Sequence, residues 1–85
     1  MRNYPATLVR VFENRVEDGA DTDEDVTFDK ADLQRATDEL DIDVREVTEI
    51  ASAYSSTRNL PDEIAAHGFG DIEHVEGDTY RFVRD

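Results

Sequence analysis

The chain has 85 residues, of which 38% are hydrophobic and 36% are charged, so it is long enough for one small domain, residues 1–85. It carries 22 acidic residues against 9 lysines and arginines, and the formal net charge of −13 excludes long-range electrostatic attraction to a polyanion. The absence of cysteine excludes disulfides and thiolate metal sites, and no apolar run is long enough to cross a membrane.

The basic residues are biased towards arginine, because Lys30 is the single lysine. High acid content with almost no lysine and no cysteine resembles the composition of cytosolic proteins from salt-accumulating halophiles. The N-terminus has no signal-peptide hydrophobic region, so we expect a cytoplasmic protein. In molar salt the Debye length is about 3 Å, so the net charge does not by itself exclude a nucleic-acid partner.

Two windows, Met1–Phe12 and Ile50–Pro61, contain no carboxylate side chain. In so acidic a chain, an acid-free window is a candidate contact surface. The alternative is a buried helix face, which excludes carboxylates for packing reasons. Both interpretations stay open at this point.

The first predicted helix spans Pro5–Val16, and Pro5 suits its first turn. The acidic segment Glu17–Asp25 follows as a solvated loop. The helix is identified by apolar side chains that recur every four residues and share one face: Tyr4, Leu8, Phe12 and Val16.

A short strand at Val26–Phe28 precedes a second helix that ends near Leu40. Asp29 is predicted to cap this helix at its N-terminus, with Asp32 at the third helical position. The pattern repeats at Asp43, where a third helix is predicted over residues 44–57. The tight connection between the two helices predicts a helix-turn-helix, and the third helix carries an apolar stripe: Val47, Ile50, Ala51 and Tyr54.

A short helix is predicted to start at Pro61, and a β-hairpin follows it. Its strands are Asp71–Glu76 and Thr79–Val83, and a glycine at the first position of the two-residue loop indicates a type II′ turn. In this register Val75 faces Tyr80. The predicted fold is therefore α+β, a winged helix in which a helix-turn-helix precedes a C-terminal β-hairpin wing.

Metal binding is not expected from the acidic loop or from the histidines. Residues 21–32 place aspartates as in a calcium-binding loop, but Val26 occupies the glycine position and Asp32 replaces the bidentate glutamate. His67 and His74 have no third ligand arranged around them. The serines lack a nucleophile elbow and the glycines form no phosphate-binding loop, so we expect neither an enzyme nor a cofactor.

The first functional hypothesis is weak, salt-dependent DNA binding by the third helix and the hairpin. Acidic residues on the N-terminal half of that helix, Glu46 and Glu49, repel phosphates, so the contacts are expected at its C-terminal end and on the wing. The residues predicted to contact DNA are Ser55, Ser56, Arg58, Asn59, Arg81 and Arg84.

The second hypothesis is a protein-interaction or dimerisation module on the same fold, so the chain is expected to be a monomer or a homodimer. Its contact face is either the window at residues 50–61 or the first helix, where adjacent apolar positions widen the apolar arc. The first-helix residues expected on that face are Tyr4, Leu8, Val11 and Phe12.

The chain from Tyr54 onward, together with VTFDKADLQRATDELDIDV before it, resembles the N-terminal winged-helix-like domain of prokaryotic, haloarchaeal-type restriction-endonuclease-like proteins. The resemblance implies a module that precedes a nuclease domain and helps to bind DNA. It rests on a pattern of tyrosine, arginine, Leu-Pro, glycine and aromatic positions: Tyr54, Arg58, Leu60, Pro61, Ile64, Gly68, Ile72, Glu73, Gly77, Tyr80 and Phe82.

Overall fold

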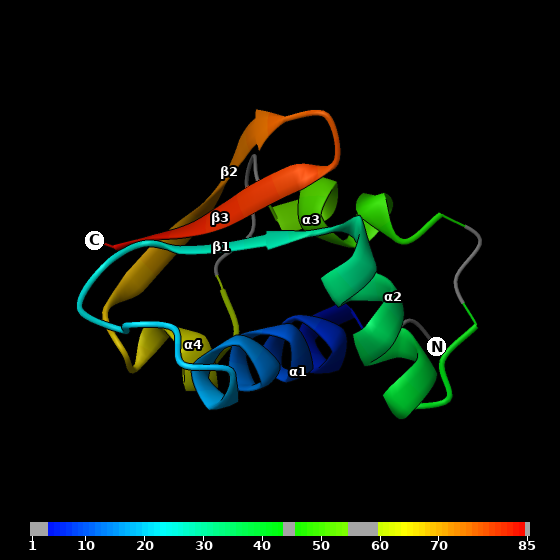
Figure 1. The fold of residues 1–85 in the computed structure, drawn as a ribbon, viewed down its shortest axis with the longest axis horizontal. Coiled ribbons are helices and arrows are strands. Elements are labelled where there is room, and N and C mark those ends of the chain that lie inside the picture. The colour runs from blue at the N-terminus through cyan, green and yellow to red at the C-terminus, as the bar shows by residue number, and fades with distance from the viewer. Residues whose placement is uncertain (1–3, 44–45, 55–59, 85) are drawn as a thin grey trace.

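Helices cover one face of a three-stranded antiparallel sheet in the computed structural model, which describes residues 4–43, 46–54 and 60–84 (Figure 1). The predicted α+β class is confirmed. Among the described residues, no helix is long and apolar enough to span a membrane. The elements in chain order are α1 (Tyr4–Glu17), β1 (Val26–Asp29), α2 (Lys30–Glu39), α3 (Thr48–Tyr54), α4 (Asp62–Ala65), β2 (Phe69–Glu76) and β3 (Thr79–Arg84).

Helix α1 matches its predicted span to within one residue at each end and lies across the covered face of the sheet (Figure 1). Its four-residue stripe is buried at Tyr4, Leu8 and Phe12, as a helix packed on a core requires. Val16, predicted on the same face, is 37% exposed because it lies beyond the last turn that the core covers.

Helix α2 begins as the sequence predicted. The Asp32 backbone N–H donates to Asp29 Oδ1 at 3.1 Å, and the Asp29 N–H donates back to Asp32 Oδ2 at 3.0 Å. At its other end Asp41 adopts a left-handed φ of 56°, and the Ile42 N–H donates to the Thr37 carbonyl at 2.9 Å. This is a Schellman termination, which turns the chain away from the helix axis.

The predicted start of the third helix is wrong. Helix α3 begins at Thr48, whereas the capping pattern at Asp43 predicted a start at residue 44; residues 44, 45 and 55–57 of that prediction lie outside the described part. The acceptor at the observed start is Glu46, which takes a 3.0 Å hydrogen bond from the Thr48 hydroxyl. The left-handed turn at Asp41 redirects the chain, so the helical path does not resume at Asp43.

The hairpin has the predicted loop but a different register. Gly77 has a φ of 50°, as the first position of a type II′ turn requires. Tyr80 is paired with His74 and not, as predicted, with Val75. A β-bulge causes the shift, because β2 contains one extra residue between His74 and Glu76, and Val75 there is 45% exposed.

The strand order is β1-β3-β2, so the strand that precedes α2 pairs with the second strand of the hairpin. The inward-facing side chains of this sheet pack against all four helices to form one core. The apolar stripe of α3 belongs to that core, which confirms the burial interpretation for the first half of the second acid-free window. The buried sheet residues are Val26, Phe28, Phe69, Ile72, Tyr80 and Phe82.

Candidate functional site

The residues predicted to contact DNA are distributed over two regions, only one of which the structure describes. Arg81 lies on the outer face of the sheet, where its guanidinium pairs with Glu73 at 2.6 Å. Its Nε atom is buried without a hydrogen-bond partner. The other predicted residues near α3, which lie outside the described part, are Ser55, Ser56, Arg58 and Asn59.

Arg84 ties three segments of the fold together. Its backbone N–H donates to Asp25 Oδ1 at 2.9 Å, and its Nη1 donates to the carbonyls of His67 (2.8 Å) and Thr22. The guanidinium also stands over the Phe69 ring, 5.2 Å from its centroid. These contacts give Arg84 a structural role, and they occupy donors that a phosphate contact needs.

The surface around α3 and the hairpin loop is acidic where the structure describes it. Glu46 and Glu49 are exposed at the start of α3, and Glu76 and Asp78 are exposed at the hairpin loop. The ammonium of Lys30 pairs with Glu46 at this helix start, at 3.9 Å. Phosphates brought to this surface meet carboxylates first.

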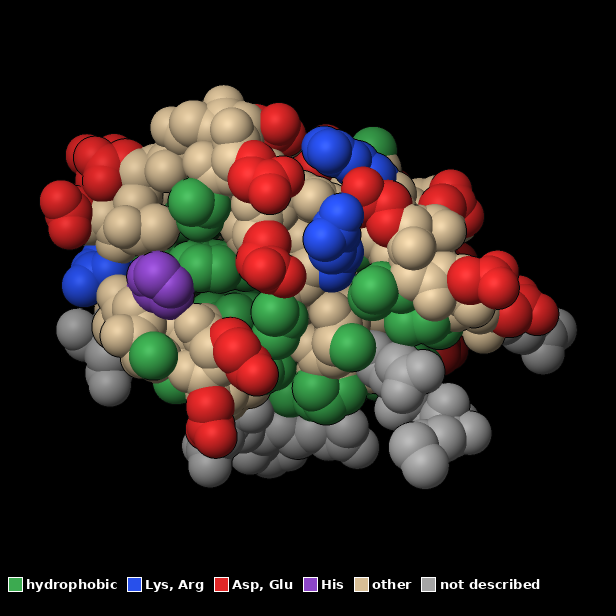
Figure 2. All heavy atoms as spheres, turned by 90° about the horizontal axis from the view of Figure 1, so that it is seen from below, with side chains coloured by type: hydrophobic (Ala, Val, Ile, Leu, Met, Phe, Trp, Pro, Cys, Tyr) green, Lys and Arg blue, Asp and Glu red, His purple; other side chains and the backbone are tan. Residues whose placement is uncertain are grey.

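The predicted protein-contact face on the first helix is corrected by the structure. All four of its residues are in the core, because α1 turns this side towards the sheet. The adjacent side of α1 remains open to solvent, as seen from below in Figure 2, where hydrophobic side chains gather among carboxylates. The four residues that were predicted to face a partner and are buried instead are Tyr4, Leu8, Val11 and Phe12.

A groove runs along this open side, between α1 and α4. It consists of two adjoining hollows that share Val9, Glu13 and Glu63. The first hollow has a volume of about 290 Å³ and reaches Val16 and Glu17. The second extends to Pro5 in the first turn of α1 and to Pro61 just before α4. Apolar side chains form the floor of this α1–α4 groove, as in protein sites that take an apolar ligand or a side chain of a partner.

The groove floor is held rigidly by aromatic packing. The Phe12 ring lies 5.1 Å from the His67 ring and makes edge contacts with Phe69 and Phe82 at 5.3 and 5.6 Å between centroids. The His67 carbonyl is in turn fixed by Arg84. The Phe12 ring beneath the floor is thus part of the core, and a partner would meet a preformed surface.

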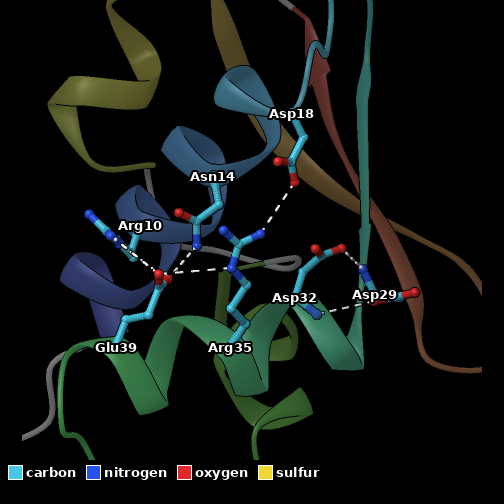
Figure 3. A network of polar contacts seen from close by, with 7 residues as sticks. All are labelled: Arg10, Asn14, Asp18, Asp29, Asp32, Arg35 and Glu39. Carbon is cyan, nitrogen blue, oxygen red and sulfur yellow. Dashed lines mark hydrogen bonds and ion pairs between the residues drawn. The ribbon is translucent and has the colours of Figure 1, made fainter.

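A polar network secures α1 to α2 next to the groove (Figure 3). Glu39 accepts hydrogen bonds from Asn14 Nδ2 at 2.7 Å and from Arg10 Nε at 3.3 Å, and these bonds lower the pKa of its carboxyl. Arg35 pairs with Asp18 at 3.3 Å and approaches Glu39 at 3.8 Å. Arg10, the cation that lines the groove, therefore already has an anionic partner.

This groove was not predicted, although the sequence of α1 contains a signal for it. Val9 and Val16 are seven residues apart and so lie on the same side of α1. The four-residue spacing places Val16 in the predicted core stripe, and Val9 is one of the adjacent apolar positions that widen the apolar arc. The contribution of α4 had no local signal, because Glu63 and His67 come to α1 only through tertiary packing.

No group of three or more histidine, aspartate or glutamate side chains in the described part is placed to hold a metal ion. Within the calcium-like segment, residues 26–29 form strand β1, and Asp29 and Asp32 are engaged in the capping box of α2. Burial raises the pKa of the Asp32 carboxyl.

Comparison with family models, with curated proteins and with solved structures finds no match to this chain.

Proposed function

We propose that this chain is a protein-interaction module and that it binds its partner through the α1–α4 groove. The observation that carries the proposal is the open apolar floor formed by Val9 and Val16, with buried Phe12 beneath them. An apolar hollow exposed on an otherwise highly charged surface is characteristic of an interaction site. Docking there would remove the partner's apolar side chains from contact with water, which favours binding.

We also propose that the module has a winged-helix fold. The element order and the strand order β1-β3-β2, with the short strand pairing to the hairpin, support this proposal. In that arrangement α3 takes the place of the recognition helix and the β2–β3 hairpin is the wing. The fold alone does not decide what is bound, because one fold supports many functions.

DNA binding is the second candidate function, and the strand order just described is the observation that favours it. It is the accessory role that the resemblance to restriction-endonuclease-like proteins implies. Among the described residues the electrostatics weigh against it, since Glu46 and Glu49 are exposed at the start of α3 while Arg81 and Arg84 already have partners. DNA binding would then depend on Arg58, which lies outside the described residues.

An isotope-labelled chain titrated with two probes separates the two functions. The first probe is a neutral amphipathic helical peptide with a leucine face and a glutamine face, and the second is duplex DNA at about 0.05 M and about 0.5 M salt. We expect the peptide to shift the methyl signals of Val9 and Val16. Peptide binding at the groove without DNA-induced shifts supports the protein-interaction function.

A matched pair of variants locates the binding. Val16→Ser removes apolar surface from the groove and is expected to weaken peptide binding about tenfold, as the loss of a docked valine side chain would. Val75→Ser removes a valine of comparable exposure (45% against 37% for Val16) from the hairpin and should leave the affinity unchanged. Salt-sensitive DNA shifts over residues 79–84, with no peptide binding up to about 1 mM, would overturn the proposal in favour of DNA.

A further inference from the structure

We infer that the partner segment of the α1–α4 groove is a cationic amphipathic helix, an inference that rests on the proposed function. The shape of the groove is the first reason. From Pro5 to Val16 it follows α1 for about 17 Å, or three helical turns. One wall is α1 along this whole length, and the other is the single turn α4 with Pro61 and His67 beside it. None of the lining residues lies in a strand, so the groove offers no strand edge, and a helix laid along α1 is the mode that fits.

The charges around the groove are the second reason. Glu13 and Glu17 stand one turn apart on α1, and Glu63 lies across the groove at the start of α4. None of these three makes an ion pair in the part of the chain that the structure describes. The groove therefore presents unpaired carboxylates on both sides of an apolar floor, and lysines or arginines flanking the partner's apolar face complement them.

The same charges argue against a second copy of the chain as the occupant. A two-fold dimer through the groove would bring the same patch of both subunits together, so the glutamates of one groove would face the acidic rim of the other. Each copy also carries a net charge of −13. Like charges brought together across an interface disfavour it, whereas a cationic helix reduces the repulsion.

Three peptides of about four helical turns test the inference. They share one leucine face and differ only in a polar face of lysine, glutamine or glutamate. At about 0.1 M salt we expect the lysine peptide to bind about tenfold more tightly than the glutamine peptide, which is about 1.4 kcal/mol, and the glutamate peptide to bind most weakly. At about 1 M salt the charge-dependent difference should disappear, because the Debye length falls to about 3 Å.

Two triple variants separate the groove from the general acidity of the surface. Glu13→Gln with Glu17→Gln and Glu63→Gln should remove the advantage of the lysine peptide over the glutamine peptide. A control triple variant changes three exposed glutamates away from the groove and removes the same net charge, so it should retain most of that advantage. The control substitutions are Glu24→Gln, Glu49→Gln and Glu76→Gln.

The outcomes distinguish this inference from the function on which it rests. If the glutamine peptide binds at Val9 and Val16 as tightly as the lysine peptide, the cationic partner is overturned and the interaction function stands. If sedimentation shows a dimer and the Val16 methyl signal shifts as the dimer forms, the cationic partner is likewise overturned and the interaction function stands. If none of the peptides perturbs Val9 or Val16, the proposed function itself fails.

Discussion

At the scale of single residues, two aspartates with similar sequence surroundings have different roles. Asp29 and Asp43 each follow a hydrophobic residue and precede an acidic residue by three positions, the pattern of a capping box. Only Asp29 forms one in the structure. The difference arises because α3 does not start until Thr48, five residues after Asp43, so Asp43 does not stand at the N-cap position of that helix.

Replacing these aspartates is expected to reveal that difference. Asp29→Ala should lower the free energy of unfolding by about 1 kcal/mol, since it removes a side-chain acceptor from the first turn of α2. Asp43→Ala should change it by less than about 0.5 kcal/mol, as for an exposed residue without such a role. Urea denaturation measures both, and equal losses would show that Asp43 caps a helix after all.

At the scale of elements, the hairpin and its surroundings are joined by contacts that span the chain. Gly68 has a φ of 96°, and a Cβ atom there would lie 2.6 Å from Arg84 Nη2. The glycine thus allows the left-handed turn before β2 and leaves room for the guanidinium. This packing links the segment before β1, the turn after α4 and the end of β3.

A double-mutant cycle tests this link. Gly68→Ala should lower the free energy of unfolding by about 1–2 kcal/mol for the left-handed backbone, with a further loss from displacing Arg84. In an Arg84→Ala background the further loss should vanish, which gives a coupling of about 0.5–1 kcal/mol between the two sites. Strictly additive effects in chemical denaturation would mean that the guanidinium is not packed against Gly68.

At the scale of the whole molecule, carboxylates greatly outnumber cations, with 22 acidic residues against 9 lysines and arginines. The five ion pairs among the described residues are all partly exposed to solvent. Each such pair contributes little to the free energy of unfolding. The ion pairs therefore offset little of the repulsion that a net charge of −13 creates within the fold. Repulsion among these charges opposes the compact state, and salt screens it.

The free energy of unfolding should accordingly rise by about 1–3 kcal/mol between about 0.1 M and about 2 M KCl, a large fraction of the stability of a small domain. The control triple variant of Glu24, Glu49 and Glu76 should show a smaller rise, because it begins with less repulsion. This comparison separates charge screening from the general strengthening of apolar burial by salt. Stability that is unchanged or falls with salt would contradict the expectation.

Much of this fold could be predicted from local patterns, because hydrophobic periodicity and capping act within a few residues. The span of α1, the capping box at Asp29, the buried stripe of α3 and the loop at Gly77 all follow from neighbouring side chains. The start of α3 and the hairpin register could not be predicted this way. A left-handed residue at Asp41 and a bulge at Val75 changed the chain path without a clear local signal.

The sequence by itself determined the acidity, the α+β pattern and most of the residues that form the core, since these depend on composition and on spacing. Only the tertiary structure decided which apolar residues of α1 remain in contact with water. The packing of α1 on the sheet buries Phe12 but leaves Val16 exposed, and the placement of α4 brings Glu63 and His67 beside them. A groove is a property of two surfaces that meet, so neither segment could specify it alone.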